Sequence, residues 1–168
     1  MTNTERKLVD KLMAKSISNE DFKRNFTVDV LQNPYYIMQI LEIAYIEKEL
    51  HDVESALFVG FVFNLFTEDF VEILCKLIEE PWHYQHEDIA RLLQKLKSPQ
   101  TVECLYKTAL TQFEYLEFDE AFALAVKCIW ALGDINTPKS REKLELLTQS
   151  DNEIIRDNAI NQLDRISK

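Results

Sequence analysis

Glycine and proline are scarce in this chain. Its 168 residues include only 2 glycines and 4 prolines, whereas average usage is roughly 7% and 5%. Two glycines cannot build a glycine-rich phosphate-binding loop, and they allow few tight β-hairpins. The scarcity therefore argues against nucleotide-binding α/β folds and all-β folds. The 46% of hydrophobic residues excludes a disordered chain.

Long apolar runs and paired cysteines are absent as well. The longest unbroken apolar run, residues 56–63, is far shorter than the roughly 20 residues that span a bilayer. Residues 1–8 lack the apolar segment of a secretory leader. The three cysteines, Cys75, Cys104 and Cys128, are odd in number and widely spaced, unlike a disulfide framework or a thiolate metal site. We expect reduced, buried thiols in a cytoplasmic protein that spans no membrane.

The negative charge is concentrated in one stretch. The chain has 29 acidic and 19 basic residues, a formal net charge of -10. Residues 42–89 alone contain 12 acidic and 2 basic residues, which equals the whole imbalance. Such a field repels phosphate backbones and anionic lipid and attracts a basic partner. We expect a basic protein partner and no nucleic acid; an acidic face that serves only solubility is the alternative.

Apolar residues recur at helical spacing almost throughout. Start and stop signals divide the chain into about eight helices. Thr2 with Glu5 forms a capping-box pattern, and Thr137 before Pro138 is typical of a helix start. Because no linker divides the chain, we expect one all-α domain over residues 1–168.

The helices from residue 53 onward repeat in pairs. Equivalent leucines in the first helices stand 31, 36 and 31 residues apart, at Leu65, Leu96, Leu132 and Leu163. Periods of this length are typical of stacked helical hairpins, each too small to bury its own apolar face.

Residues 131–147 read ALGDINTPKSREKLELL and resemble a bacterial HEAT-type repeat. In that family a first helix ends in Ala-Leu-Gly, a short turn carries proline, and a second helix follows. Residues 151–159, DNEIIRDNA, match the start of the next repeat. The resemblance is clearest over residues 119–166 and implies an armadillo-like α-solenoid, a right-handed α-α superhelix. Residues 53–168 would form the HEAT-like repeats and residues 1–50 would form N-terminal capping helices.

The resemblance also suggests functions. Solenoids of this type include scaffolds, bilin-lyase subunits, DNA glycosylases and small bacterial immunity proteins that neutralise secreted toxins. The acidic middle of the chain argues against the DNA-binding group. We therefore expect an immunity protein that occludes a toxin, for example a nuclease with a basic cleft. A scaffold or adaptor, and a bilin-lyase-like subunit, are the alternatives.

Signals for catalysis are weak. His83 and His86, with Glu87 or Asp88, could supply metal ligands, but their spacing is not that of a zincin. Pro81 places His83 in a turn before a helix start. Nothing near the cysteines lowers a thiol pKa. We expect no enzyme, no catalytic residue, no metal and no cofactor.

The second helices of a solenoid line its concave face, the usual binding surface. We expect glutamates of the helix after Thr67 to lie on one exposed stripe, and the next second helix to continue it. The connection at residues 113–118 adds two more glutamates among aromatics, as in interface hot spots. Inward packing of Phe113, Leu116 and Phe118 is the alternative. The candidate partner-binding residues are Glu68, Glu72, Glu79, Glu80, Glu103, Glu114 and Glu117.

Overall fold

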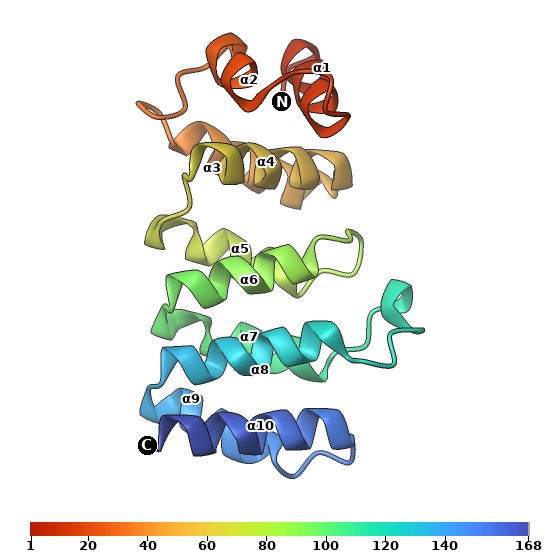
Figure 1. Cartoon of the computed structure of the whole chain (residues 1–168), viewed down its shortest axis with the longest axis vertical. Helices are drawn as coiled ribbons and strands as arrows, with labels where there is room; N and C mark the ends of the chain where they lie inside the picture. Colours follow the sequence, from red (N-terminus) through yellow and green to blue (C-terminus); the bar gives the residue numbers. More distant parts are fainter. Residues whose placement is uncertain (168) are drawn as a thin grey trace. The chain divides into compact units, whose positions relative to one another are not determined.

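A computed structural model describes residues 1–167, which form ten α-helices and no strand (Figure 1). The prediction of an all-α chain is confirmed. The predicted count of about eight is too low. The shortest helices are α2 and α5, of 7 and 8 residues. The helices are α1 (Asn3–Met13), α2 (Asn19–Asn25), α3 (Tyr35–Glu47), α4 (Leu50–Phe63), α5 (Val71–Ile78), α6 (His86–Leu96), α7 (Val102–Leu110), α8 (Ala123–Ile135), α9 (Pro138–Leu147) and α10 (Glu153–Ile166).

Local signals set several helix ends. Thr2 forms the expected capping box at the start of α1. Thr137, the expected start of a helix, forms a capping box with Ser140 at the start of α9. Four helices end in a left-handed residue, a position that glycine usually takes. Because neither glycine has a positive φ, these ends use Lys48, Asn64, Lys97 and Asn136. None of the helices in residues 1–167 is both long enough and apolar enough to cross a bilayer.

The contacts divide the chain into two compact units, residues 1–66 and the part from Thr67 onward. In the first unit α3 packs against α4, and α1 packs against α2 and α4. Its core contains Phe22, Leu41 and Leu57, which are almost fully buried.

A buried carboxylate links the parts of this first unit. Glu5 of α1 is 1% exposed and accepts hydrogen bonds of 2.6 Å from the hydroxyls of Thr27 and Tyr36. Burial alone would raise the pKa of Glu5, but these bonds and those from Thr2 outweigh it and hold the pKa below its ordinary value. The charged form of Glu5 therefore joins α1 to α3.

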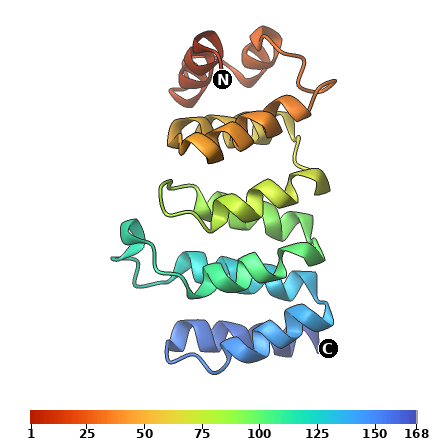
Figure 2. The same cartoon turned by 180° about the vertical axis from the view of Figure 1, so that it is seen from behind.

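The second unit has two layers of helices. α5, α7 and α9 pack in sequence in one layer, and α6, α8 and α10 in the other. Figure 1 shows the layer of α6, α8 and α10 in front, and Figure 2 shows the other layer. Leu74, Leu93, Leu105 and Ile129 are buried in this unit. Across the two layers α5 packs against α6, α7 against α8, and α9 against both α8 and α10.

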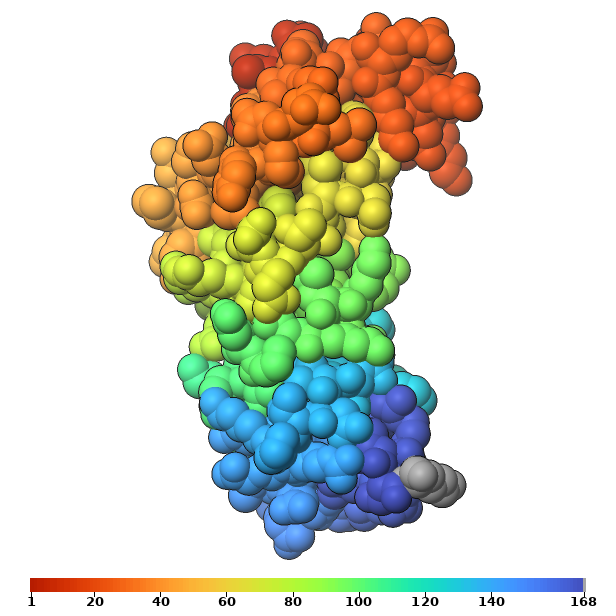
Figure 3. Space-filling view, turned by 90° about the vertical axis from the view of Figure 1, so that its left-hand side faces the viewer, coloured from red at the N-terminus to blue at the C-terminus, as the bar shows by residue number. Residues whose placement is uncertain are grey.

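Gly133, the glycine of the Ala-Leu-Gly motif, allows a close approach of α8 and α10. A Cβ there would lie 2.4 Å from Oε1 of Gln162 and 2.9 Å from Nη2 of Arg165. With glycine in place, Arg165 donates to Asp134 at 2.7 Å. Arg141 of α9 also donates to the carbonyl of Ile166 at 3.0 Å. Figure 3 shows this side of the unit, with α9 in blue and the last turns of α10 in dark blue.

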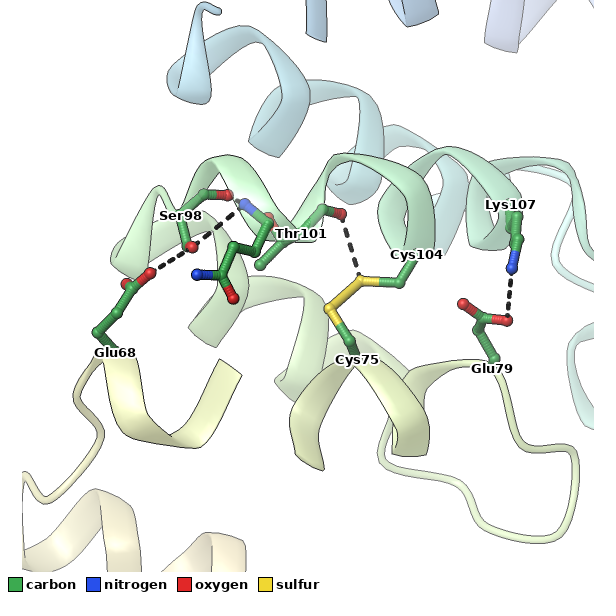
Figure 4. Close-up of a disulfide and its surroundings, with 8 residues drawn as sticks. Glu68, Cys75, Glu79, Ser98, Thr101, Cys104 and Lys107 are labelled. Carbon is green, nitrogen blue, oxygen red and sulfur yellow. Dashed lines mark hydrogen bonds and ion pairs between the residues drawn. A yellow bond between two sulfur atoms is a disulfide. The ribbon is translucent and has the colours of Figure 1, made fainter. Parts of the chain in front are cut away.

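A disulfide joins Cys75 of α5 to Cys104 of α7 (Figure 4). The expectation of reduced thiols is therefore wrong for these two residues. Their pairing depends on the packing of α5 against α7, which the sequence separation of 29 does not reveal. Cys128 is free and buried, as expected, and burial raises the pKa of its thiol.

Two polar contacts flank the disulfide. Ser98, just before α7, donates to Glu68, and Lys107 of α7 donates to Glu79 at 3.2 Å (Figure 4). The α5 and α7 segments are therefore joined at both ends as well as in the middle.

We expect removal of the disulfide by the double change Cys75→Ser and Cys104→Ser to lower the free energy of unfolding by about 3 kcal/mol, because the bond closes a loop of roughly 30 residues. Denaturant unfolding of the variant and the parent chain measures this difference.

Alkylation in denaturant followed by mass spectrometry tests the bond itself. One thiol, that of Cys128, should react without reductant, and all three should react after reduction. Three modified thiols in the unreduced chain would show that the bond does not form.

Candidate functional site

The glutamates after Thr67 do not form one helical stripe. Thr67 makes no side-chain capping bond, and Glu68 lies in a 3₁₀ turn that precedes α5. Glu72 lies in α5, whereas Glu79 and Glu80 follow its last residue. The helix is shorter than the spacing of the acidic residues suggested.

Lysines neutralise much of the acidic charge on the layer of α5, α7 and α9. They hold the pKa values of Glu72 and Glu103 below their ordinary range by hydrogen bonding. Such exposed pairs contribute little to stability, but they remove free negative charge. The pairs are Glu72–Lys76 (2.6 Å), Glu79–Lys107 (3.2 Å), Glu103–Lys139 (2.9 Å) and Glu103–Lys143 (3.3 Å). Glu80 accepts a hydrogen bond from the indole of Trp82 at 2.9 Å.

Unpaired carboxylates gather instead in the connection between α7 and α8, residues 111–122, here called the 111–122 segment. It contains four acidic residues and no basic one. Among the residues that the structure describes, Glu114, Glu117 and Glu120 form no ion pair. Asp119 accepts hydrogen bonds from the backbone N–H groups of Ala121 and Ala123, at 3.1 and 2.7 Å. This segment therefore carries negative charge that no lysine or arginine in residues 1–167 pairs with.

The aromatic residues of the segment divide between the interior and the solvent. Phe113 is 4% exposed, whereas Phe118 is 91% exposed. Inward packing is therefore right for Phe113 and wrong for Phe118. Figure 1 shows the segment, in teal, extending beyond the ends of α7 and α8.

Phe113 and Tyr115 hold the segment against the start of α6. The ring centroids of Phe113 and His86 lie 3.9 Å apart. The hydroxyl of Tyr115 donates to Nδ1 of His86 at 2.9 Å. Tyr84 contacts the Tyr115 ring edge to face, with the centroids 5.1 Å apart.

His83 and His86 are fully buried and stack with their centroids 4.3 Å apart. Nε2 of each ring bonds to a backbone carbonyl at 2.8 Å, that of Leu77 for His83 and that of Glu80 for His86. Since a carbonyl can only accept, each Nε2 carries a proton. Nδ1 of His83 accepts from the N–H of Gln85 at 3.1 Å. Both rings are therefore neutral, with the proton on Nε2.

Burial lowers the pKa of both histidines, to about 4 for His86, where His83 adds a further lowering. All four ring nitrogens have partners within the protein. Glu87, the nearest candidate third ligand, pairs with Lys127 at 2.8 Å. In residues 1–167 no group of three potential ligands could hold a metal ion. The histidines serve as the internal support of the 111–122 segment.

A cavity of about 260 Å³ lies where the 111–122 segment meets the start of α10. Its lining includes apolar residues, among them Leu110, Phe122 and Ile155, and the acidic residues Glu117 and Asp119. Leu110 is 51% exposed, so the cavity opens at the surface.

No family model, characterised protein or solved structure matches this chain. Its function must therefore be inferred from the geometry of the candidate site.

Two of the residues predicted from the sequence, Glu114 and Glu117, lie in the 111–122 segment. Their role in binding stays a prediction. Neither the contact of His86 with the 111–122 segment nor the cavity has a local signal in the sequence. His86 and Tyr115 are 29 residues apart, and the cavity is lined by two separate stretches of the chain.

We expect stability to depend on pH through His86. The folded chain keeps this ring neutral down to about pH 4, whereas the unfolded chain takes up the proton near pH 6.5. The contribution of His86 to the free energy of unfolding is therefore fully present above about pH 6.5, and it is lost as the pH falls toward 4. Between pH 7.5 and 5.0 the free energy of unfolding should decrease by about 2 kcal/mol from this group. Denaturant titrations at several pH values measure the decrease.

The groups around His86 are His83, Glu87 and Tyr115, so the control must leave them in place. In the His86→Gln variant the free energy of unfolding should fall much less between pH 7.5 and 5.0. In the His51→Gln variant, a change at an exposed position of α4, it should fall as much as in the parent chain. An equal decrease in the His86→Gln variant would contradict the assignment.

Proposed function

We propose that this chain is a HEAT-like α-solenoid that binds another protein, and more specifically an immunity protein that binds and occludes a basic secreted toxin. The two-layer packing of α5 to α10 supports the solenoid, as does the repeat pattern of residues 119–166. The approach of α8 and α10 at Gly133 gives the Ala-Leu-Gly motif a role expected of a repeat junction.

The 111–122 segment is the observation that carries the proposal. It combines unpaired carboxylates with Phe118, which is 91% exposed. An aromatic anchor surrounded by charge is typical of a protein-binding hot spot.

The mechanism is steric occlusion combined with electrostatic attraction, without turnover. A cleft that binds phosphate groups is basic, and an acidic protein approaches it faster than a neutral one because long-range attraction steers the encounter. This mechanism needs neither a catalytic residue nor a cofactor. It requires only that the segment is held in place, which Phe113 and His86 do.

We propose a cytoplasmic location, following the sequence prediction. The Cys75–Cys104 disulfide is the observation that speaks against it, because disulfides are rare in the cytosol.

A scaffold or adaptor for other proteins is the second candidate. In its favour, α3 of the first unit exposes Tyr35, Ile43 and Ile46 at 58%, 51% and 76%. At helical spacing these three residues lie on one side of α3. Exposed apolar patches mark interaction sites, and an adaptor needs a second one.

Affinity capture from the native host with the full chain as bait tests the proposal. We expect recovery of one basic protein, whose toxicity the chain suppresses, and lower recovery at 500 mM than at 50 mM salt because salt screens the attraction. Recovery of several housekeeping proteins would favour the scaffold instead.

Charge reversal identifies the surface. The bait with Glu114→Lys and Glu117→Lys should recover at least tenfold less partner. The matched control, Glu142→Lys and Glu145→Lys, makes the same change in net charge at exposed positions of α9 and should recover nearly as much as the parent. An equal loss in both baits would show that net charge, rather than the 111–122 segment, decides binding.

A further inference from the structure

The cavity beside the 111–122 segment has an unbalanced charge. Its lining includes two acidic residues, Glu117 and Asp119, and no lysine, arginine or histidine. The nearby lysines are engaged elsewhere, Lys107 with Glu79 and Lys127 with Glu87. No basic side chain of residues 1–167 therefore offsets the two acidic residues that line this cavity.

The end of α7 adds to this negative potential. The helix ends at Leu110, and Ala109 and Leu110 both line the cavity. In the described part of the chain, no backbone N–H beyond the helix bonds to the carbonyl oxygens of these two residues. The carboxyl end of a helix favours a cation. The helix end and the side chains thus point independently to a positively charged ligand.

The size and walls of the cavity suit a side chain with an apolar stem. Its volume of about 260 Å³ far exceeds the roughly 30 Å³ of a water molecule in the liquid. Leu110, Leu116, Phe122 and Ile155 supply apolar surface. A small hydrated ion gains no binding free energy from such apolar walls. The methylene groups of a long basic side chain do gain it, because they can pack against the walls.

We propose that this cavity is the socket for an arginine side chain of the basic partner, an inference that rests on the proposed function. Arginine carries a planar guanidinium with five donors, which can bind a carboxylate such as Glu117 in a bidentate manner. Its weak hydration and flat shape suit a site with aromatic and aliphatic walls better than the compact ammonium of lysine. Arginine is also enriched among residues that dominate binding energy at interfaces.

An amide NMR titration of the full chain at low salt, with acetyl-Gly-Gly-Arg-Gly-Gly-amide as the probe, tests the socket. Saturable shifts should appear at Glu117, Asp119 and Asn152, which line the cavity. The peptide with citrulline, which has nearly the same shape but no charge, should bind at least tenfold more weakly, and the lysine peptide at least threefold more weakly. Shifts scattered over the surface, or equal affinity for the arginine and lysine peptides, would overturn the assignment.

A matched pair of variants on the same segment locates the charge. Glu117→Gln should weaken the arginine peptide at least fivefold. Glu114→Gln, outside the cavity lining, should change its affinity less than twofold. Asp119 is left unchanged because it caps the turn before α8. Equal weakening by both changes would show general attraction to an acidic surface and no socket.

The outcome is independent of the capture experiment, because the probe is a peptide. Specific arginine binding together with the capture of several housekeeping proteins would leave the socket standing and reject the immunity function. Capture of one basic toxin by a chain that does not distinguish the arginine peptide from the citrulline peptide would reject the socket and leave the immunity function standing.

Discussion

The packing of Phe113 and Tyr115 against His86 is the contact on which the candidate site depends. The 111–122 segment carries four carboxylates, which repel one another and favour an extended, solvated conformation. The ring contact of Phe113 with His86, at 3.9 Å between centroids, and the hydrogen bond from Tyr115 hold one end of the segment. The turn at Asp119 holds the other end. Between them Phe118 and the glutamates are displayed to solvent.

The same chain uses acidic residues in two distinct ways. On α5, α7 and α9 they meet lysines of the same or the next helix, as Glu103 meets Lys139 and Lys143, and these pairs accompany the stacking of the helices. In the 111–122 segment Glu114 and Glu117 have no such partner, although basic residues occur on the helices nearby. Charge that is left unpaired beside an exposed aromatic ring and an acidic cavity is available to another molecule.

Local patterns predicted the helices well, and contacts between distant residues account for what was missed. Thr2 and Thr137 act as caps through atoms within three residues of them, so their pattern is visible in the sequence. Cys75 and Cys104, by contrast, meet only because α5 packs on α7. The sequence likewise predicted acidic residues on one face of the second helices, but it did not show that lysines of the next helix pair neutralise them. The alternation of aromatic and acidic residues around Glu114 and Glu117 is local and visible in the sequence, whereas the cavity depends on the start of α10, about 30 residues further on.

Hydrogen exchange of the chain, alone and bound to its purified basic partner, tests most directly whether the 111–122 segment is the binding surface. The account predicts that binding slows exchange strongly in residues 111–122 and at the start of α10, next to the cavity. It predicts little change in α5, α7 and α9. Slower exchange confined to those three helices or to α3, with residues 111–122 unchanged, would contradict the account.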